Sequence, residues 1–154
     1  MQTQQLEIIK NIGCQVRSFL EDLQPDTTWD QHLSGACAVG AYITHKLLLR
    51  QNIHSSVIIG TGSDMDHCWV DIELDNDLVV LDTTATQFNK ELDVVILALK
   101  NEYKQLAFHK EIPEERLFVT DSILFNALRD WHISQQPIRY EQEIYNSFGI
   151  KIID

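Results

Sequence analysis

The sequence has few cysteines and no long apolar run. Three cysteines, Cys14, Cys37 and Cys68, occur among 154 residues, and none forms a C-x-x-C pair. An odd set at these spacings argues against a disulfide framework and against a cysteine zinc site, so we expect reduced thiols. No stretch approaches the roughly 18 to 20 apolar residues of a membrane helix, and residues 1–10 lack the features of a signal peptide. We therefore expect a cytoplasmic protein without membrane association; export by a signal-free route stays open.

Positive charge is also scarce. Twelve Lys and Arg stand against 23 Asp and Glu, which gives a formal net charge of −11. Such a surface repels nucleic-acid phosphates and anionic lipid headgroups, so we expect no nucleic-acid partner. The segment Gly60–Ser63 is too short for a phosphate loop and lacks its Gly-Lys-Ser/Thr ending.

Nothing in the sequence divides the chain. It contains no repeat, no low-complexity segment and no Gly/Ser-rich linker, and 44% of its residues are hydrophobic. This composition is ordinary for one globular domain. We predict a single domain over residues 1–154.

Two helices are expected in the first third of the chain. Apolar residues recur at three- and four-residue spacing over 4–23, which predicts an amphipathic helix that Pro25 ends. These are Leu6, Ile9, Gly13, Val16, Leu20 and Leu23. Cys14 lies beside this stripe, and we expect it to pack. A second, mostly buried helix is predicted over 36–51, where Lys46 and Arg50 favour the negative end of the helix dipole.

The pattern then changes to short strands, predicted over 56–59, 67–74 and 78–84. The strand over 67–74 alternates, with Cys68 on the core face and His67 and Trp69 on the other. A run over 93–97 is rich in β-branched residues and favours a fourth strand. Helices are expected near 122–131 and 138–148. The order of elements predicts the α+β class.

Three residues with complementary chemistry fall at the boundaries of these elements. Cys37 lies near a helix start, His67 opens a strand, and Asp82 lies near the end of the next strand. A helix N-terminus and an imidazolium both lower the pKa of a thiol. A histidine can then act as base and acid, and a carboxylate can fix its tautomer. The three residues predict a Cys-His-Asp catalytic triad.

The hairpin between the predicted strands over 67–74 and 78–84 tests this assignment. If the chain turns at Asp75 and Asn76, Leu74 pairs with Asp77, and Asp82 lies opposite Trp69. This register makes His67 and Asp82 diagonal neighbours on one face, about 7 to 8 Å apart at Cα. A slip of one residue would place them on opposite faces.

The residues around the three positions resemble the transglutaminase-like branch of papain-like thiol enzymes. The segments are Ser34–Cys37, opening a helix, His67–Asp71 on a strand, and Leu81–Thr84 on the next. The order and spacing suit small bacterial members, and the match spans 31–88, including the tail Thr86–Phe88. The resemblance implies a papain-like core, with a helix carrying Cys37 packed on a small antiparallel sheet.

The resemblance also implies further site residues. Papain-like enzymes place a Gln six residues before the nucleophile, where Gln31 stands, so Gln31 and the Cys37 backbone N–H would form the oxyanion hole. Trp69 and Trp29 are candidates for the walls of a substrate cleft, although Trp69 could equally pack between sheet and helix. Larger transglutaminases have Trp after the nucleophile, and this chain has Ala38. We therefore favour hydrolysis of a carboxamide in a protein or peptide substrate (peptidase, amidase or deamidase) through a thioester, without a cofactor.

Two other functions stay open. The chain could be a non-catalytic binding protein that keeps the fold, or an acyltransferase that uses acyl-CoA, although its negative charge disfavours CoA phosphates. Asp64, Asp66 and His67 could also suggest a metal site, but no second His or Cys ligand lies at a convincing spacing. We expect no bound metal.

Overall fold

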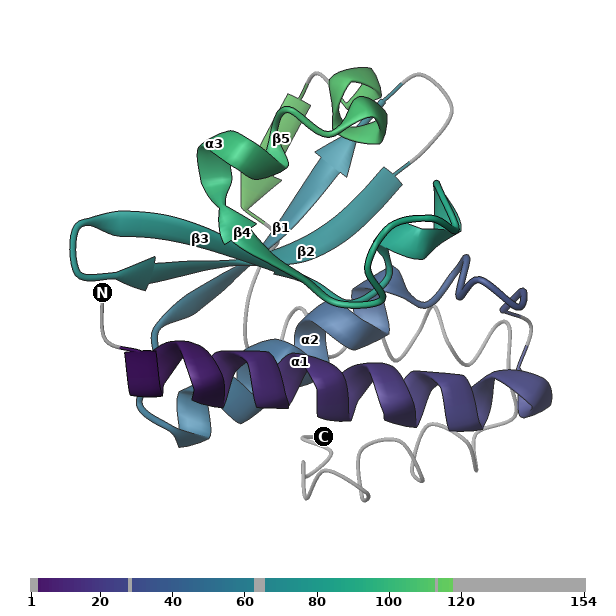
Figure 1. Ribbon diagram of the computed structural model, residues 1–154. Helices are drawn as coiled ribbons and strands as arrows, with labels where there is room; N and C mark the ends of the chain where they lie inside the picture. The colour runs from purple at the N-terminus through teal and green to yellow at the C-terminus, as the bar shows by residue number, and fades with distance from the viewer. Residues whose placement is uncertain (1–2, 28, 63–65, 113, 118–154) are drawn as a thin grey trace.

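The computed structural model describes residues 3–27, 29–62, 66–112 and 114–117. Two helices, α1 and α2, lie on one side of a twisted sheet, and α3 lies on the other side (Figure 1). The chain therefore has the α+β architecture that the sequence predicts. The helices predicted near 122–131 and 138–148 lie outside the described residues.

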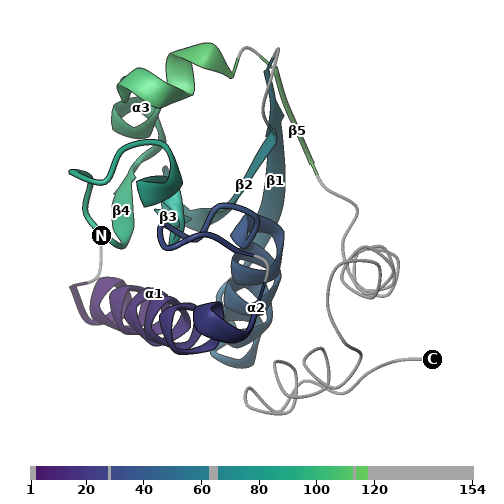
Figure 2. The same cartoon turned by 90° about the vertical axis from the view of Figure 1, so that its right-hand side faces the viewer.

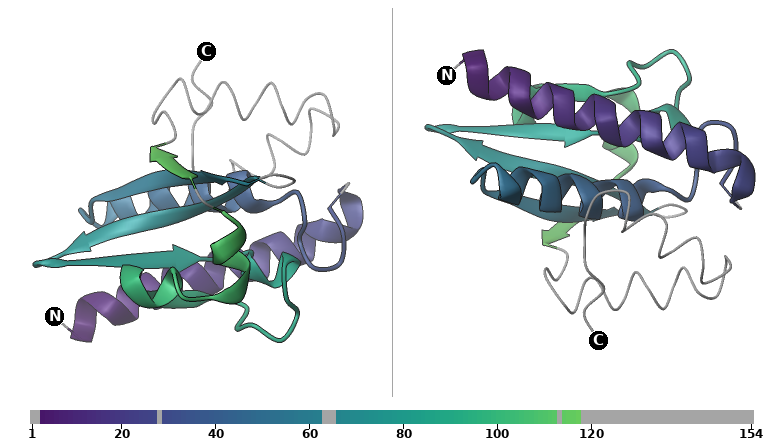
Figure 3. Two further views of the ribbon diagram at one scale, coloured as in Figure 1. Left: turned by 90° about the horizontal axis from the view of Figure 1, so that it is seen from above. Right: turned by 90° about the horizontal axis from the view of Figure 1, so that it is seen from below.

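The two long helices agree with the sequence pattern. Helix α1 spans Thr3–Leu23, and its stripe is buried at Ile9, Gly13, Val16 and Leu20. Helix α2 spans Cys37–Arg50 and is buried along most of its length. The helices lie side by side against the sheet (Figure 3).

The expectation that Cys14 packs was wrong, because Cys14 is exposed. One residue along a helix turns the side chain by about 100°. Gly13 faces the sheet: a Cβ on it would lie 2.7 Å from Val95 and 2.9 Å from Leu81. Cys14 is thereby turned toward solvent.

Five strands form one antiparallel sheet in the order β4-β3-β2-β1-β5. Their bounds are Ser55–Thr61 (β1), Asp66–Leu74 (β2), Asp77–Asp82 (β3), Ile96–Leu99 (β4) and Glu114–Leu117 (β5). Leu74 pairs with Asp77, and the ladder continues to Val70 and Leu81, so the predicted hairpin register is confirmed. Asp75 has a φ of 53°, a left-handed turn conformation that Asp tolerates.

The ends of two strands differ from the prediction. Strand β3 ends at Asp82, and a short 3-10 helix, η2, follows over Ala85–Gln87. Strand β4 begins at Ile96, which pairs with Asp82, and not at residue 93. Residues 93–95 have no strand to pair with, because β3 has already ended.

Short elements complete the second face of the sheet. They are the 3-10 helix at Ala107–Glu111 (η3) and one helical turn at Lys100–Tyr103 (α3), whereas the 3-10 helix at Gln24–Asp26 (η1) continues directly from α1. The sequence analysis predicted none of these, nor β5. Figure 2 shows α3 and the helical segment after it across the sheet from α1 and α2.

Apolar side chains form a core on each face of the sheet. The larger core lies between the sheet and the two long helices and contains Cys68, as predicted. The smaller core gathers Trp69, Val80, Ala85, Tyr103, Phe108 and Ile112. Among the described residues, no helix is both long and apolar enough to span a membrane.

Candidate active site

The structure brings the three predicted residues together. Cys37 is the first residue of α2, His67 lies near the start of β2, and Asp82 ends β3. His67 Nε2 lies 2.7 Å from Asp82 Oδ2, and both side chains are fully buried. Cys37 is half-buried, and Cys68 and His67 both interact with its thiol and lower the pKa of that thiol. A thiol, an imidazole and a carboxylate thus form one connected group.

Two further donors hold the Asp82 carboxylate. The Thr84 backbone N–H donates to Asp82 Oδ1 at 2.9 Å, and the Tyr103 hydroxyl donates to Oδ2 at 2.8 Å. The carboxylate is thereby fixed in its orientation toward His67. Tyr103 comes from α3 and is buried in the smaller core, so the far side of the sheet supports the site.

Close packing brings α2 to the end of β3. A Cβ on Gly40 would lie 2.9 Å from Thr83 Oγ1 and 3.1 Å from Leu20 Cδ1, so glycine allows this approach. Buried Arg17 on α1 donates to the Thr83 carbonyl at 3.0 Å and to Thr86 Oγ1 at 2.8 Å. These contacts fix the turn after Asp82 against both helices.

Electrostatics favour a charged His67. Burial by itself lowers the pKa of this imidazole, but the charge and hydrogen bond of Asp82, with smaller contributions from Cys37, raise it from 6.5 to about 10. Burial raises the pKa of Asp82, but the His67 charge outweighs this, and the net effect is a lowered pKa. At neutral pH the buried pair is an imidazolium and a carboxylate.

The same charge acts on Cys37. The pKa of its thiol is well below the ordinary value, because the hydrogen bond from Cys68 and the hydrogen bond and charge of His67 outweigh the cost of burial. The pKa of Cys68 is raised, first through its contact with Cys37 and then through burial. Of the two thiols, Cys37 is therefore the one that ionises more readily.

Gln87, for which the sequence pattern predicted no role, contacts His67 directly. Gln87 ends η2, and its side-chain Nε2 lies 2.8 Å from His67 Nδ1. Gln87 lies in the segment Thr86–Phe88, which is part of the family resemblance, and this was the signal in the sequence that could have indicated it. Asp82 and Gln87 thus lie at opposite ring nitrogens of His67, and the Gln87 amide N–H can donate to Nδ1 only when the ring is neutral.

The predicted oxyanion residue Gln31 lies on an exposed loop before α2. Its amide Nε2 lies 3.4 Å from His32 Nε2. Among the hydrogen bonds of the described residues, none joins Gln31 to Cys37 or His67. The role of Gln31 stays a prediction.

The two tryptophans occupy different places. Trp69 is 1% exposed and packs in the smaller core, with its ring centroid 5.8 Å from that of His67 and 5.3 Å from that of Tyr103. This is the packing position that the sequence left as an alternative to a cleft wall. Trp29 is buried in the loop before α2, and a Cβ on Gly35 would lie 3.1 Å from its ring. Contact of either ring with a substrate stays a prediction.

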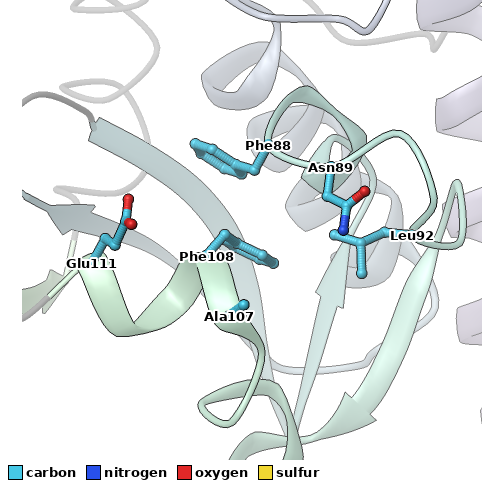
Figure 4. Close-up of a pocket in the computed structure, with 6 residues that line it drawn as sticks. All are labelled: Phe88, Asn89, Leu92, Ala107, Phe108 and Glu111. Atoms are coloured by element: carbon cyan, nitrogen blue, oxygen red, sulfur yellow. The ribbon is translucent and has the colours of Figure 1, made fainter.

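A pocket of about 380 Å³ lies between η3 and the segment that follows η2 (Figure 4). Its lining consists of Phe88, Asn89, Leu92, Ala107, Phe108 and Glu111. Phe88 and Phe108 stack at 4.8 Å, and their ring centroids lie 4.7 and 6.0 Å from that of His67. The pocket is mainly apolar, with Asn89 and Glu111 at opposite ends (Figure 4).

A second charged cluster lies behind Trp69. Buried Lys100 forms ion pairs with Asp71 and Glu115, each at 3.1 Å, and lies over the Trp69 ring. The two ion pairs connect α3, which carries Lys100, with β2 and β5, which carry the two carboxylates. Within the described parts of the chain, no group of three His, Cys, Asp or Glu could hold a metal ion. Asp64, considered above as a ligand, lies outside the described residues.

Comparisons of the chain with protein-family models, with curated proteins and with solved structures found no match.

Proposed function

We propose that the protein is a thiol-dependent hydrolase or acyltransferase with a papain-like, transglutaminase-like core that acts on a carboxamide of a protein or peptide. The observation that carries this proposal is the connected group of a half-buried Cys37 with a lowered pKa, a fully buried His67 and a fully buried Asp82. A buried ion pair of this kind costs stability, and reactive sites are where such groups concentrate.

The reaction would begin with attack of the Cys37 thiolate on the carboxamide carbon. The C=O electron pair moves to oxygen, where the Cys37 backbone N–H, at the start of α2, and a side-chain amide stabilise the negative charge. The intermediate collapses to a thioester, and the departing amine takes the proton of His67 Nδ1. Water, or a second amine, then gives up a proton to His67 and attacks the thioester, which releases Cys37.

Asp82 has a separate role in this scheme. It accepts a hydrogen bond from His67 Nε2 throughout the reaction, so Nδ1 is the ring nitrogen that exchanges protons with Cys37 and the substrate. Thr84 and Tyr103 keep the carboxylate in this orientation. Ala38 after the nucleophile supports water as the favoured acceptor.

The test is the pH dependence of iodoacetamide labelling, with the labelled cysteine located by mass spectrometry. Cys14, exposed on α1, serves as the reference thiol in the same molecule. We expect the labelling rate of Cys37 to follow an apparent pKa well below 8. In His67→Ala the fast labelling at low pH should be lost, while the labelling of Cys14 should not change. An ordinary thiol profile for Cys37, unchanged in His67→Ala, would refute the proposal and favour a non-catalytic binding protein.

A further inference from the structure

Gln87 is a second candidate for the side-chain amide that the proposed mechanism requires, a role for which the sequence predicted Gln31. The amide nitrogen of Gln87 lies 2.8 Å from His67 Nδ1, the ring nitrogen that exchanges protons with Cys37 in the proposed mechanism. The opposite nitrogen, Nε2, lies 2.7 Å from Asp82. The Gln87 amide is therefore beside the atoms at which the reaction would occur, and it reaches them from η2.

The turn that carries Gln87 is well fixed. The Gln87 backbone N–H donates to the Thr84 carbonyl at 3.2 Å. Arg17 binds the Thr83 carbonyl and the Thr86 hydroxyl from helix α1. The main chain of η2 thus has little freedom, while the long Gln87 side chain, which is only half-buried, can still turn about its own bonds.

The Gln87 contact changes with the charge of the ring. A neutral imidazole with its proton on Nε2 accepts the amide N–H at Nδ1. An imidazolium carries a proton on Nδ1 and cannot accept it. When His67 is protonated and its Nδ1–H faces the Cys37 thiolate, the Gln87 N–H needs another acceptor nearby.

We infer that Gln87 donates its side-chain N–H to the oxyanion that forms when Cys37 attacks a carbonyl, together with the Cys37 backbone N–H. This inference rests on the proposed function. A substrate carbonyl attacked by Cys37 places its oxygen next to the thiol and to His67 Nδ1, where the displaced amide finds its acceptor. As the C–S bond forms, the C=O electron pair moves to that oxygen, and two N–H groups stabilise the charge. Collapse restores the C=O bond and expels the leaving group.

Gln31 is the competing candidate for this role. It lies on the exposed loop before α2, and its amide contacts His32 at 3.4 Å. Gln87 contacts the base itself at 2.8 Å and is less exposed. The geometry therefore favours Gln87 as the oxyanion donor, although the spacing from Cys37 along the chain favours Gln31.

The experiment compares two reactions of Cys37 in the full-length protein. Acylation by p-nitrophenyl acetate passes through an oxyanion, and its leaving group departs without a proton. Alkylation by iodoacetamide is a displacement at an sp³ carbon and forms no oxyanion. We expect Gln87→Ala and Gln87→Glu to lower the acylation rate by about 100-fold, the scale of losing one oxyanion donor, and the alkylation rate by no more than about threefold. Gln105→Ala, an exposed glutamine on the far loop, is the matched control and should change neither rate.

The possible outcomes distinguish a failure of the inference about Gln87 from a failure of the proposed function. Equal falls in both rates would mean that Gln87 acts only through His67, and would overturn the inference. A loss of acylation in Gln31→Ala with normal acylation in Gln87→Ala would also overturn it and would assign the donor to Gln31. Slow alkylation of Cys37 in the wild-type protein would refute the proposed function itself. Retained alkylation in a Gln87 variant shows that the variant is folded around Cys37.

Discussion

Replacing Asp82 by Asn is the sharpest test of the electrostatics of the site. The rise in the His67 pKa from 6.5 to about 10 depends on the charge and hydrogen bond of Asp82. At about 1.4 kcal/mol per pKa unit, this rise is a preference of on the order of 5 kcal/mol for the protonated ring. Asn has nearly the same size but no charge, so burial, which lowers the pKa, is opposed only by the smaller contributions of Cys37, and the His67 pKa should fall well below 10.

The change at His67 should then appear at Cys37. Without an imidazolium, the half-buried thiolate loses its charged partner while the contact with Cys68 remains, so the pKa of Cys37 should rise above its wild-type value. The readout is the midpoint of the iodoacetamide rate against pH for Cys37. The midpoint is more informative than the rate at one pH, because a thiolate of low pKa is also a weaker nucleophile, which offsets part of the gain in ionisation.

Two controls make the result interpretable. Cys14 reports the reactivity of an exposed thiol in the same sample. Asp71→Asn removes a carboxylate that pairs with Lys100 and not with His67, so it should leave the Cys37 midpoint unchanged. A Cys37 midpoint in Asp82→Asn equal to that of the wild type would show that Asp82 does not set the charge of His67, and the reasoning above would fail.

Two more predictions follow from the same contacts. In the wild-type protein, the rate of Cys37 alkylation should rise well below pH 8, as the thiol ionises, and then stay level through neutrality. It should rise again near pH 10, because the thiolate becomes more basic when His67 loses its proton. A single rise near pH 8.5 would contradict this. Gly40→Ala should lower the free energy of unfolding by about 1 kcal/mol in urea titrations, because a Cβ 2.9 Å from Thr83 Oγ1 costs about 1 to 3 kcal/mol and outweighs the gain of about 1 kcal/mol in helix propensity. A more stable Gly40→Ala variant would show that α2 does not press on the end of β3.

Sequence reasoning succeeded where short-range rules decide the structure. The stripe on α1 follows from the 3.6-residue period, and the start of α2 at Cys37 agrees with the predicted helix start. The tight turn at Asp75 and Asn76 fixed the register of β2 and β3. Because side chains alternate along a strand, this register alone placed His67 and Asp82 on one face.

Sequence reasoning did less well at the ends of elements. Cys14 was placed on the wrong side of α1 by one residue, and β4 begins at Ile96 because its partner strand ends at Asp82. Where a strand stops depends on its neighbour, which the pattern of one segment does not contain. The short elements α3, η3 and β5 are too brief for periodicity to reveal.

The sequence by itself indicated Cys37, His67 and Asp82 as candidate site residues and the order in which the main elements follow. Only the tertiary structure decided how that site is supported: Tyr103 binds Asp82 from across the sheet, and Gln87 reaches His67 Nδ1 from the turn after β3. It also decided that His67 is fully buried, the condition under which its charge and that of Asp82 control one another strongly. These contacts join segments that are distant along the chain, and no local propensity encodes them; they arise when the sheet and the helices pack.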